Sequence, residues 1–349
     1  MKMILKLVLL IAVLAGLVLL ILIAYATLTD YKPDEKTVVF ESNEPQVIRA
    51  GAELAFMIWN IGYGGLSADM DFFYDGGKQV RTSEINVRQN LEAITRFIGE
   101  NQASDFMLLQ EVDRCSGRSY HLDEFYSISK FLKNFQACFG TNYDVKFVPM
   151  PITSPLGRVS SGLATFSKQV PKSSTRYSFP GNYGWPKGLF MLDRCFLVNR
   201  YAVSGGEELL VINTHNSAYD DGSLRKGQMD YLKTFLTDEY RKGNYIIVGG
   251  DWNQCAPGFS PGFDEKIFDT HDYSLIDKDY LPQDWTWLYD NKTPSNRRLQ
   301  APYDSEKSLV TVIDFYLLSP NINGISNQTV NLNFRHSDHQ PVLAKIKLK

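Results

Sequence analysis

The sequence predicts a layered α+β domain that follows a single hydrophobic helix at the N-terminus. Apolar, strand-like runs intermix with helical segments without strict strand–helix alternation, which favours packed layers over a doubly wound parallel sheet. Hydrophobic residues make up 44% and aromatic residues 13% of the 349-residue chain, which is enough for a sizeable core and too much for disorder. No internal repeat or low-complexity segment is visible, so repeat architectures are set aside.

The N-terminal segment has no polar side chain from Leu7 to Ala24. This run just reaches the length of roughly 20 residues that a helix needs to cross a bilayer. Lys2 and Lys6 precede it, so the positive-inside rule places the N-terminus in the cytoplasm and the rest of the chain outside. The sequence therefore predicts a single-pass membrane anchor over residues 1–26 with an extracytoplasmic body.

A cleaved signal peptide is the alternative for the same segment. Ala24-Tyr25-Ala26 fits the small-residue pattern of a signal peptidase site, and cleavage after Ala26 would make the body secreted or periplasmic. We favour the uncleaved anchor because the apolar run is long for the central region of a signal peptide.

The remaining chain divides into a polar lead-in and a compact domain. Residues 27–52 are polar and contain two prolines, which predicts a linker or loosely packed lead-in, and the domain covers 53–349. The net charge is −3, and about −5 without the two N-terminal lysines, which argues against strong non-specific binding of a polyanion through net charge alone. Four cysteines show no zinc-ligand spacing, and their pairing stays open: Cys115, Cys138, Cys195 and Cys255.

The first half of the domain begins with a buried strand over 54–59, a continuous apolar run that ends at a polar residue. Apolar residues at helical spacing then predict a helix over 87–99, and a second apolar run predicts a strand over 106–109. The expected elements that follow are a helix over 125–139 and strands over 144–148 and 162–166.

The second half continues with strands over 196–199 and 209–213 and a helix over 228–239, again from apolar runs and helical spacing. The apolar run 245–248 meets two glycines, the signature of a strand that enters a tight turn. Residues 264–300 are expected to be irregular. Strands over 310–318 and 342–346 complete the domain.

Several of these strands end in a polar residue that could serve a common site. Asn and Asp are ordinary turn residues, so a single one would carry little meaning. Glu111 is harder to dismiss, because a charge at the end of a buried strand needs a partner. Oxygen ligands of this kind suit Mg²⁺ or Mn²⁺ better than zinc or copper. The strand-end residues are Asn60, Glu111, His215, Asp251 with Asn253, and Asp338 with His339.

His339 has the surroundings of a functional imidazole. It follows Asp338 directly, and Asp314 lies on the preceding predicted strand. A carboxylate beside an imidazole fixes its tautomer and stabilises its charged form. We therefore expect a carboxylate-oriented His339.

The ordered set of motifs resembles the endonuclease/exonuclease/phosphatase superfamily, which includes deoxyribonuclease I, abasic-site endonucleases and neutral sphingomyelinases. The resemblance spans roughly residues 53–349 and implies a four-layer α-β-β-α sandwich with its site where loops of both sheets meet. The matching segments are Trp59-Asn60-Ile61, Leu109-Gln110-Glu111-Val112, Ser161-Gly162-Leu163-Ala164, Asn213-Thr214-His215, Gly250-Asp251-Trp252-Asn253, Ile313-Asp314-Phe315 and Ser337-Asp338-His339-Gln340-Pro341-Val342.

The resemblance also implies a role for each residue in phosphodiester hydrolysis with Mg²⁺ or Mn²⁺. Glu111 would be the principal metal ligand, assisted by Asn60 and Asp338. Asp251 would activate the attacking water, with Asn253 helping to hold the nucleophile and the phosphate. The phosphate-facing residues would be His339, oriented by Asp314, and His215.

The substrate stays open among nucleic acid, a phospholipid such as sphingomyelin and a small phosphoester. Three arginines near the motif loops could bind a second phosphate or a head group, although solvated surface arginines are an equally good interpretation: Arg114, Arg118 and Arg158. A catalytically silent binding domain on the same fold is the alternative class, and it is disfavoured because no catalytic candidate is lost. We expect a monomer.

Overall fold

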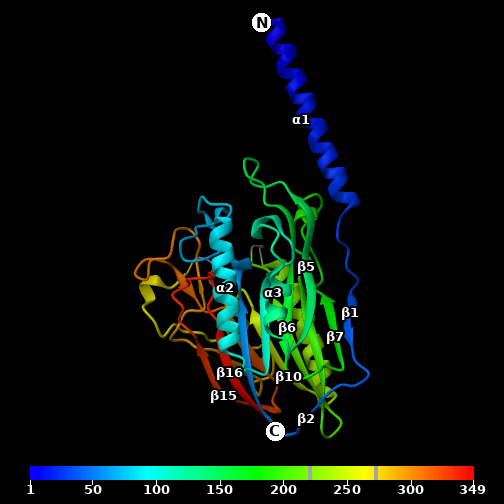
Figure 1. Ribbon diagram of the computed structural model, residues 1–349, viewed down its shortest axis with the longest axis vertical. Helices are drawn as coiled ribbons and strands as arrows, with labels where there is room; N and C mark the ends of the chain where they lie inside the picture. Colours follow the sequence, from blue (N-terminus) through cyan, green and yellow to red (C-terminus); the bar gives the residue numbers. More distant parts are fainter. Residues whose placement is uncertain (219–221, 271–273) are drawn as a thin grey trace.

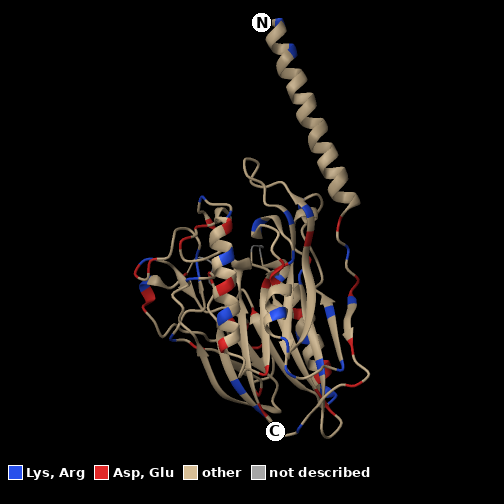
Figure 2. Cartoon of the chain, viewed as in Figure 1, with Lys and Arg blue, Asp and Glu red and all other residues tan. Residues whose placement is uncertain are grey.

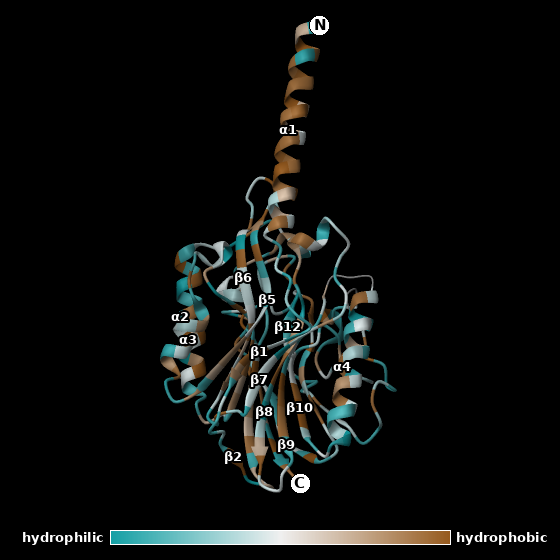
Figure 3. Ribbon diagram, turned by 90° about the vertical axis from the view of Figure 1, so that its right-hand side faces the viewer, coloured by the Kyte–Doolittle hydropathy of each residue, from teal (hydrophilic) through white to brown (hydrophobic). Residues whose placement is uncertain are grey.

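The computed structural model describes residues 1–218, 222–270 and 274–349. Two β-sheets pack face to face, and helices cover the outer surface of each sheet, so that Figure 3 shows α2 and α3 on one side and α4 on the other. The four-layer α-β-β-α arrangement implied by the motifs is therefore confirmed. The N-terminal helix projects away from this body (Figure 1).

One sheet has six strands in the described part of the chain. β3 and β4 run parallel at its centre, and the other neighbours are antiparallel. In spatial order the strands are β15 (Ile322–Thr329), β16 (Val342–Leu348), β3 (Glu53–Asn60), β4 (Phe106–Asp113), β6 (Gly157–Ser167) and β5 (Gln136–Val148).

The second sheet has eight strands within the described residues; the parallel pair β9–β10 lies near its centre, and β2 also runs parallel to β8. The spatial order is β1 (Lys36–Glu41), β7 (Ser173–Ser178), β8 (Cys195–Val203), β9 (Glu208–His215), β10 (Tyr245–Asp251), β14 (Asp314–Leu318) and β11 (Thr286–Leu288), with β2 (Val47–Ile48) paired to β8. A separate pair consists of β12 (Asn296–Arg297) and β13 (Val310–Thr311).

Two of the outer helices, α2 and α3, start at side-chain caps. Ser83 accepts a hydrogen bond from a backbone N–H at the start of α2 (Glu84–Glu100), and Asp123 does the same for α3 (Glu124–Phe131). α4 (Ser223–Arg241) covers the eight-stranded sheet. Each helix buries one apolar face, which is the physical reason for the helical spacing in the sequence.

The alternation of side chains along β3 divides the interior into layers. Phe56 and Ile58 face the core between the two sheets, whereas Met57 and Trp59 pack beneath α2 and α3. All four are buried, which explains why this strand reads as a continuous apolar run.

Three expectations about the elements are corrected. The helix expected over 125–139 ends at Phe131, and β5 begins at Gln136. The segment 27–52, expected as a linker, contributes β1 and β2 to the edge of a sheet. The strand expected over 310–318 is two strands. β13 pairs with β12 in the separate two-stranded sheet, residues 312–313 lie in neither strand, and β14 belongs to the eight-stranded sheet.

The N-terminal helix α1 (Lys2–Leu28) is the one helix among the described residues long and apolar enough to cross a membrane. Figure 2 shows its few charges gathered near the N-terminus, whereas charges of both signs are spread over the body. All four cysteines lie within the described residues and none is paired. Cys115 is exposed and the other three are buried, as expected for small apolar side chains.

Candidate active site

Three polar side chains lie in one row across adjacent strands of the eight-stranded sheet. Asp251, the last residue of β10, pairs in register with His215 at the end of β9 and with Asp314 at the start of β14. All three are buried. The row therefore brings two carboxylates and an imidazole from distant parts of the sequence to the same edge of the sheet.

Gly250 sets the path of the chain into Asp251. Its φ of 147° favours glycine, and a Cβ at this position would lie 2.1 Å from the carbonyl oxygen of Thr214 on β9. Asn253 follows with a φ of 52°, and its backbone N–H donates to Asp251 Oδ1 at 2.9 Å. The Asn253 side chain donates to the carbonyl oxygen of Asn216. This tight turn fixes the Asp251 carboxylate.

Glu111 comes from the other sheet, at an irregularity in β4. The register between β4 and β6 shifts between Leu109 and Val112, and Glu111 has a φ of 54°. An irregularity of this kind redirects a side chain, and the Glu111 carboxylate lines the central cavity. Its side chain is 24% exposed, against 2% for Asp251, so Glu111 is the more open of these two carboxylates.

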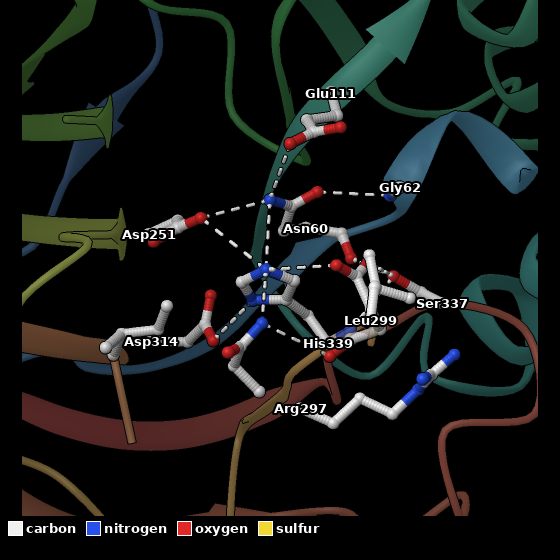
Figure 4. A network of polar contacts seen from close by, with 12 residues as sticks. Asn60, Gly62, Glu111, Asp251, Arg297, Leu299, Asp314, Ser337 and His339 are labelled. Atoms are coloured by element: carbon white, nitrogen blue, oxygen red, sulfur yellow. Dashed lines mark hydrogen bonds and ion pairs between the residues drawn. The ribbon is translucent and has the colours of Figure 1, made fainter. Parts of the chain in front are cut away.

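The amide of Asn60, at the end of β3, lies at the centre of the site (Figure 4). Its Nδ2 atom lies 3.3 Å from Glu111 Oε1, 3.1 Å from Asp251 Oδ2 and 3.4 Å from His339 Nε2. Its Oδ1 atom accepts the backbone N–H of Gly62 at 3.1 Å, which fixes this orientation. The amide nitrogen, rather than the oxygen, therefore faces the carboxylates from both sheets.

His339 is held by Asp314, as expected from the sequence. The Nδ1 atom of His339 lies 2.8 Å from Asp314 Oδ2, and Ser295 Oγ donates to the same oxygen at 2.7 Å. This contact fixes the ring and leaves Nε2 on the side of Asn60 and Asp251 (Figure 4). Asn296 Nδ2 lies 3.0 Å from Nε2.

The pKa of His339 is raised well above its usual range. Burial alone lowers the pKa of an imidazole, but the carboxylates of Asp314, Asp251 and Asp338 outweigh it and favour the imidazolium. An imidazolium donates from both nitrogens, so in that state Nε2 cannot accept a hydrogen bond from the amide nitrogen of Asn60 or Asn296, and its N–H can donate to an acceptor in the cavity. His339 thus places a positive charge at the wall of the cavity.

Two site carboxylates have raised pKa values. Burial raises the pKa of Asp251 to about 6, with His339 acting to lower it and Asp314 to raise it. Burial raises the pKa of Asp338 to about 7, with His339 acting to lower it and Glu111 to raise it. Both raised pKa values indicate that the site buries negative charge without enough positive charge nearby to stabilise it. A divalent cation would supply the difference.

His215 differs from His339 in charge. Burial lowers the pKa of His215 well below its usual range, and the positive charges of Arg194 and His339 lower it further. Its Nε2 atom lies 3.4 Å from Asp251 Oδ2 and 3.9 Å from Glu111 Oε1. These are contacts of a neutral imidazole and not ion pairs, so His215 can donate one N–H without adding charge.

Two sets of ligands could hold a cation. Asp251, Asp314 and His339 have ligand atoms within 4.8 Å of one another, but a cation there would have to break the hydrogen bond between Asp314 and His339. Glu111 and Asp338 offer carboxylate oxygens without that cost. A buried set of hard oxygen donors with excess negative charge fits Mg²⁺ or Mn²⁺.

A cavity of about 680 Å³ opens from these groups. Its polar end contains Glu111, Asp251 and His339, and its other walls combine aromatic and aliphatic side chains with polar ones, among them the basic Lys187, Arg194 and Arg297. The apolar part of the lining includes Tyr63, Leu66, Phe72, Met150, Leu156 and Phe190. One cavity therefore combines a polar end with walls that are partly apolar.

The three arginines considered for substrate binding lie in different places. Arg118 lines the cavity, but its guanidinium is committed to Asp113, with Nε to Oδ2 at 3.0 Å and Nη2 to Oδ1 at 2.8 Å. Arg114 and Arg158 each pair with an aspartate and are not among the described residues that line the cavity.

Sequence reasoning missed three residues that hold the site together. Ser295 and Asn296 contact the Asp314–His339 pair from the segment expected to be irregular. Ser337 Oγ donates to the carbonyl oxygen of Asn60 at 2.8 Å and accepts the N–H of His339 at 3.1 Å. Ser and Asn in loops carry no pattern that separates such roles from ordinary turns.

An amide pair joins the two sheets beneath the site. Gln110 Nε2 donates to Asn213 Oδ1 at 2.7 Å, and Asn213 Nδ2 donates to the carbonyl oxygens of Leu109 and Ala164, both at 3.1 Å. Gln110 precedes Glu111, and Asn213 lies two residues before His215. The amide pair therefore ties the two groups of site residues together across the interior.

The fold and the site define a class of protein: an α-β-β-α enzyme that hydrolyses phosphoester bonds. The chain belongs to the endonuclease/exonuclease/phosphatase family, whose model matches residues 57–300, and this confirms the resemblance drawn from the ordered motifs. No curated protein matches the chain significantly.

Solved structures share the fold at low sequence identity. An endonuclease/exonuclease/phosphatase from Beutenbergia cavernae has a TM-score of 0.57 at 18% identity, covering 85% of this chain and 72% of its own. ANGEL2, a 2′,3′-cyclic phosphatase, has a TM-score of 0.55 at 15% identity, and the match covers 91% of this chain and 99% of ANGEL2. TDP2 of D. rerio, complexed with a single-stranded DNA product, has a TM-score of 0.52 at 13% identity, and the match covers 84% of this chain and 99% of the TDP2 chain.

Proposed function

We propose that this protein is a divalent-metal-dependent phosphodiesterase, anchored in a membrane by α1, that cleaves its substrate by attack of water outside the cytoplasm. The observation that carries the proposal is the convergence of Glu111, Asp251 and His339 on the Asn60 amide. These groups come from both sheets and meet at the polar end of one cavity.

Asp251 is suited to receive the proton of the attacking water. Its carboxylate is fixed by Asn60 and by the backbone N–H of Asn253, and its raised pKa of about 6 makes it a better base than an exposed aspartate. The water oxygen bonds to phosphorus, the bond to the leaving oxygen breaks, and the leaving oxygen takes a proton from solvent.

His339 and His215 are suited to bind the phosphate oxygens. His339 Nε2 carries positive charge toward the place where charge accumulates on the non-bridging oxygens, and Asp314 keeps the ring in position. Neutral His215 donates one further hydrogen bond.

Glu111 and Asp338 would hold the cation, with Asn60 orienting the carboxylates around it. A bound Mg²⁺ or Mn²⁺ supplies Lewis-acid stabilisation of the developing negative charge. This assignment uses the carboxylate that is most open to the cavity and leaves the Asp314–His339 pair intact.

The experiment is an assay of the full-length chain in detergent micelles with bis(para-nitrophenyl) phosphate, with Mg²⁺ and with EDTA. We expect hydrolysis that EDTA abolishes and that Asp251→Asn or His339→Gln lowers by about 10²-fold or more. Asp230→Asn, on the exposed surface of α4, is the matched control and should behave as the wild type. Hydrolysis that survives EDTA and both site substitutions contradicts the proposal.

A further inference from the structure

Exposed apolar side chains gather at the end of the body to which α1 attaches. We call Phe147, Met150, Ile152 and Trp185 the apolar rim. Ile152 is 82% exposed, Trp185 69%, Met150 46% and Phe147 39%. Figures 1 and 3 both show the turn between β5 and β6, which carries Met150 and Ile152, at the end of the body from which α1 projects. Single exposed apolar side chains are ordinary, but several gathered at one end of the body mark an interaction surface.

The last turn of α1 rests directly against the base of the apolar rim. Tyr25, Ala26 and Thr29 line a small crevice with residues 144–147 of β5 and with Leu189 of the short helix η4 (Lys187–Phe190). Trp185 Nε1 lies 3.5 Å from Thr27 Oγ1. The rim therefore lies beside the point where the chain leaves α1.

The cavity connects the rim to the catalytic groups. Met150 belongs to the rim and also lines the cavity, whose polar end contains Asp251 and His339. The cavity lining also includes the apolar residues Leu156, Phe190 and Leu192, together with the basic residues Lys187 and Arg194. An amphiphile whose phosphate reaches Asp251 would thus have its apolar portion against an apolar wall that leads to the rim.

We propose that the apolar rim inserts into the surface of the bilayer that α1 crosses, and that the cavity takes the headgroup phosphodiester of a lipid from that bilayer. The substrate class rests on the phosphodiesterase function proposed above. The docking of the rim rests on its position beside α1 and can be tested without any activity.

The chemistry of the rim fits a bilayer better than a nucleic acid. A polyanion is held by basic side chains that neutralise its phosphates. The rim consists of aliphatic and aromatic groups, and basic side chains such as Lys187 and Arg194 line the cavity behind it, where a single headgroup phosphate would lie. Trp and aliphatic side chains at one level are typical of the membrane interface. The negative net charge of the chain also disfavours a polyanion, and α1, as the proposed membrane anchor, would hold the rim next to a bilayer.

Docking is tested by tryptophan fluorescence of the full chain in phosphatidylcholine vesicles that contain chain-brominated lipid, which quenches only inserted indoles. Trp59, Trp252 and Trp285 are buried and Trp287 is partly buried, so Trp185 is the tryptophan positioned for quenching. We expect a quenched component that Trp185→Phe removes. Docking is contradicted if brominated lipid quenches the wild type and Trp185→Phe equally, or quenches neither.

The substrate class is tested by two substrates in parallel. One is mixed vesicles of phosphatidylcholine, phosphatidylglycerol and sphingomyelin, and the other is soluble bis(para-nitrophenyl) phosphate. Ile152 is not among the described residues that line the cavity. Ile152→Glu should lower the rate of lipid hydrolysis about tenfold or more, because a charge opposes insertion into the bilayer, and should leave hydrolysis of the soluble diester unchanged. Val47→Glu, 61% exposed on β2 at the other end of the body, is the matched control and should change neither rate.

The outcomes separate the two proposals. If the wild type cleaves neither substrate with Mg²⁺ present, the proposed phosphodiesterase function fails, and the fluorescence result still decides docking. If it cleaves the soluble diester but no vesicle lipid, or if Ile152→Glu leaves lipid hydrolysis unchanged, the lipid substrate is overturned while the phosphodiesterase function stands. Cleavage of plasmid DNA with no cleavage of vesicle lipid also overturns it, in favour of a nuclease.

Discussion

His339 Nδ1 lies 2.8 Å from Asp314 Oδ2, so a side chain that precedes a strand of one sheet contacts a strand residue of the other. Asp314 begins β14 of the eight-stranded sheet, whereas His339 lies in the segment that leads into β16 of the six-stranded sheet. The orientation of the imidazole toward the cavity therefore depends on the packing of the whole sandwich and not on one loop.

Asp314→Asn should lower kcat for bis(para-nitrophenyl) phosphate by about 10²- to 10⁴-fold. The asparagine keeps the size of the side chain but removes the charge that favours the His339 imidazolium. The thermal unfolding midpoint should change little in comparison. Equal kcat in wild type and Asp314→Asn would refute the role of this pair.

Glu111→Gln should raise the Mg²⁺ concentration needed for half-maximal activity by roughly tenfold or more, because one anionic ligand becomes neutral. The measurement is a Mg²⁺ titration of the hydrolysis rate. Glu92→Gln, on the exposed face of α2, provides the comparison and should leave the titration unchanged. An unaltered titration in Glu111→Gln would show that this carboxylate does not bind the cation.

Arg118→Met should destabilise the fold by about 3–5 kcal/mol, because it leaves the Asp113 carboxylate buried without its partner. The side chain of Asp113 is 0% exposed and that of Arg118 is 10% exposed. Arg88→Met removes an exposed pair on α2 and should cost less than about 1 kcal/mol. Urea unfolding measures both; similar values for the two variants would mean that the buried pair contributes no more than a surface pair.

Gly250→Ala should destabilise the protein by on the order of 1–3 kcal/mol and lower activity as well. Its Cβ would collide with the carbonyl oxygen of Thr214, so β9 and β10 must separate beside Asp251. Gly227→Ala, inside α4 where a Cβ meets open space, should be neutral or slightly stabilising. Full stability and activity in Gly250→Ala would disprove the close approach of these strands.

Acid should destabilise the protein in part through Glu239. Burial acts to raise the pKa of this carboxyl, but hydrogen bonds from Arg200 and Lys242 outweigh it and lower the pKa to about 2, from an ordinary 4.5. Because the folded-state pKa lies below the unfolded-state value, the stabilising contribution is complete above pH 4.5 and is lost as the pH falls toward 2.

The midpoint of thermal unfolding, measured against pH, checks this contribution. The wild type should lose stability more steeply than Glu239→Gln over that acid range, whereas Glu306→Gln, at an exposed position, should follow the wild type. Parallel curves for wild type and Glu239→Gln would assign the acid sensitivity to other groups.

The sequence predicted the central strands well because they are buried on both faces. β3, β4 and β10 each read as a continuous apolar run, and their burial in two core layers is the cause. Most of the strands that were missed or misassigned lie at the edges of sheets, and β7, which pairs with both β1 and β8, is an exception. β1 is largely exposed, so no apolar run marks it, and the polar start of β5 looked like the end of a helix.

The candidate site was predictable where a charge or an imidazole follows an apolar strand. Glu111 and Asp251 stood out because a buried strand end normally avoids charge. Asn296 and Ser295 did not stand out, because their roles follow from a tertiary contact with His339 and Asp314 that no local pattern encodes. The hydrogen-bonded ion pair of Arg118 with Asp113 could not be predicted either, because no local pattern encodes that contact.

Because the amide pair of Gln110 and Asn213 ties the two sheets together, the spacing between the sheets sets the distance between the catalytic groups. Glu111 and Asp251 lie on opposite sheets. The distance between the cation-binding and the water-activating group therefore depends on the side chains packed between the sheets. Interiors packed this densely transmit small volume changes instead of absorbing them. The residues that set the catalytic distance are therefore apolar side chains, aliphatic and aromatic, that lie deep in the interior and do not contact a substrate.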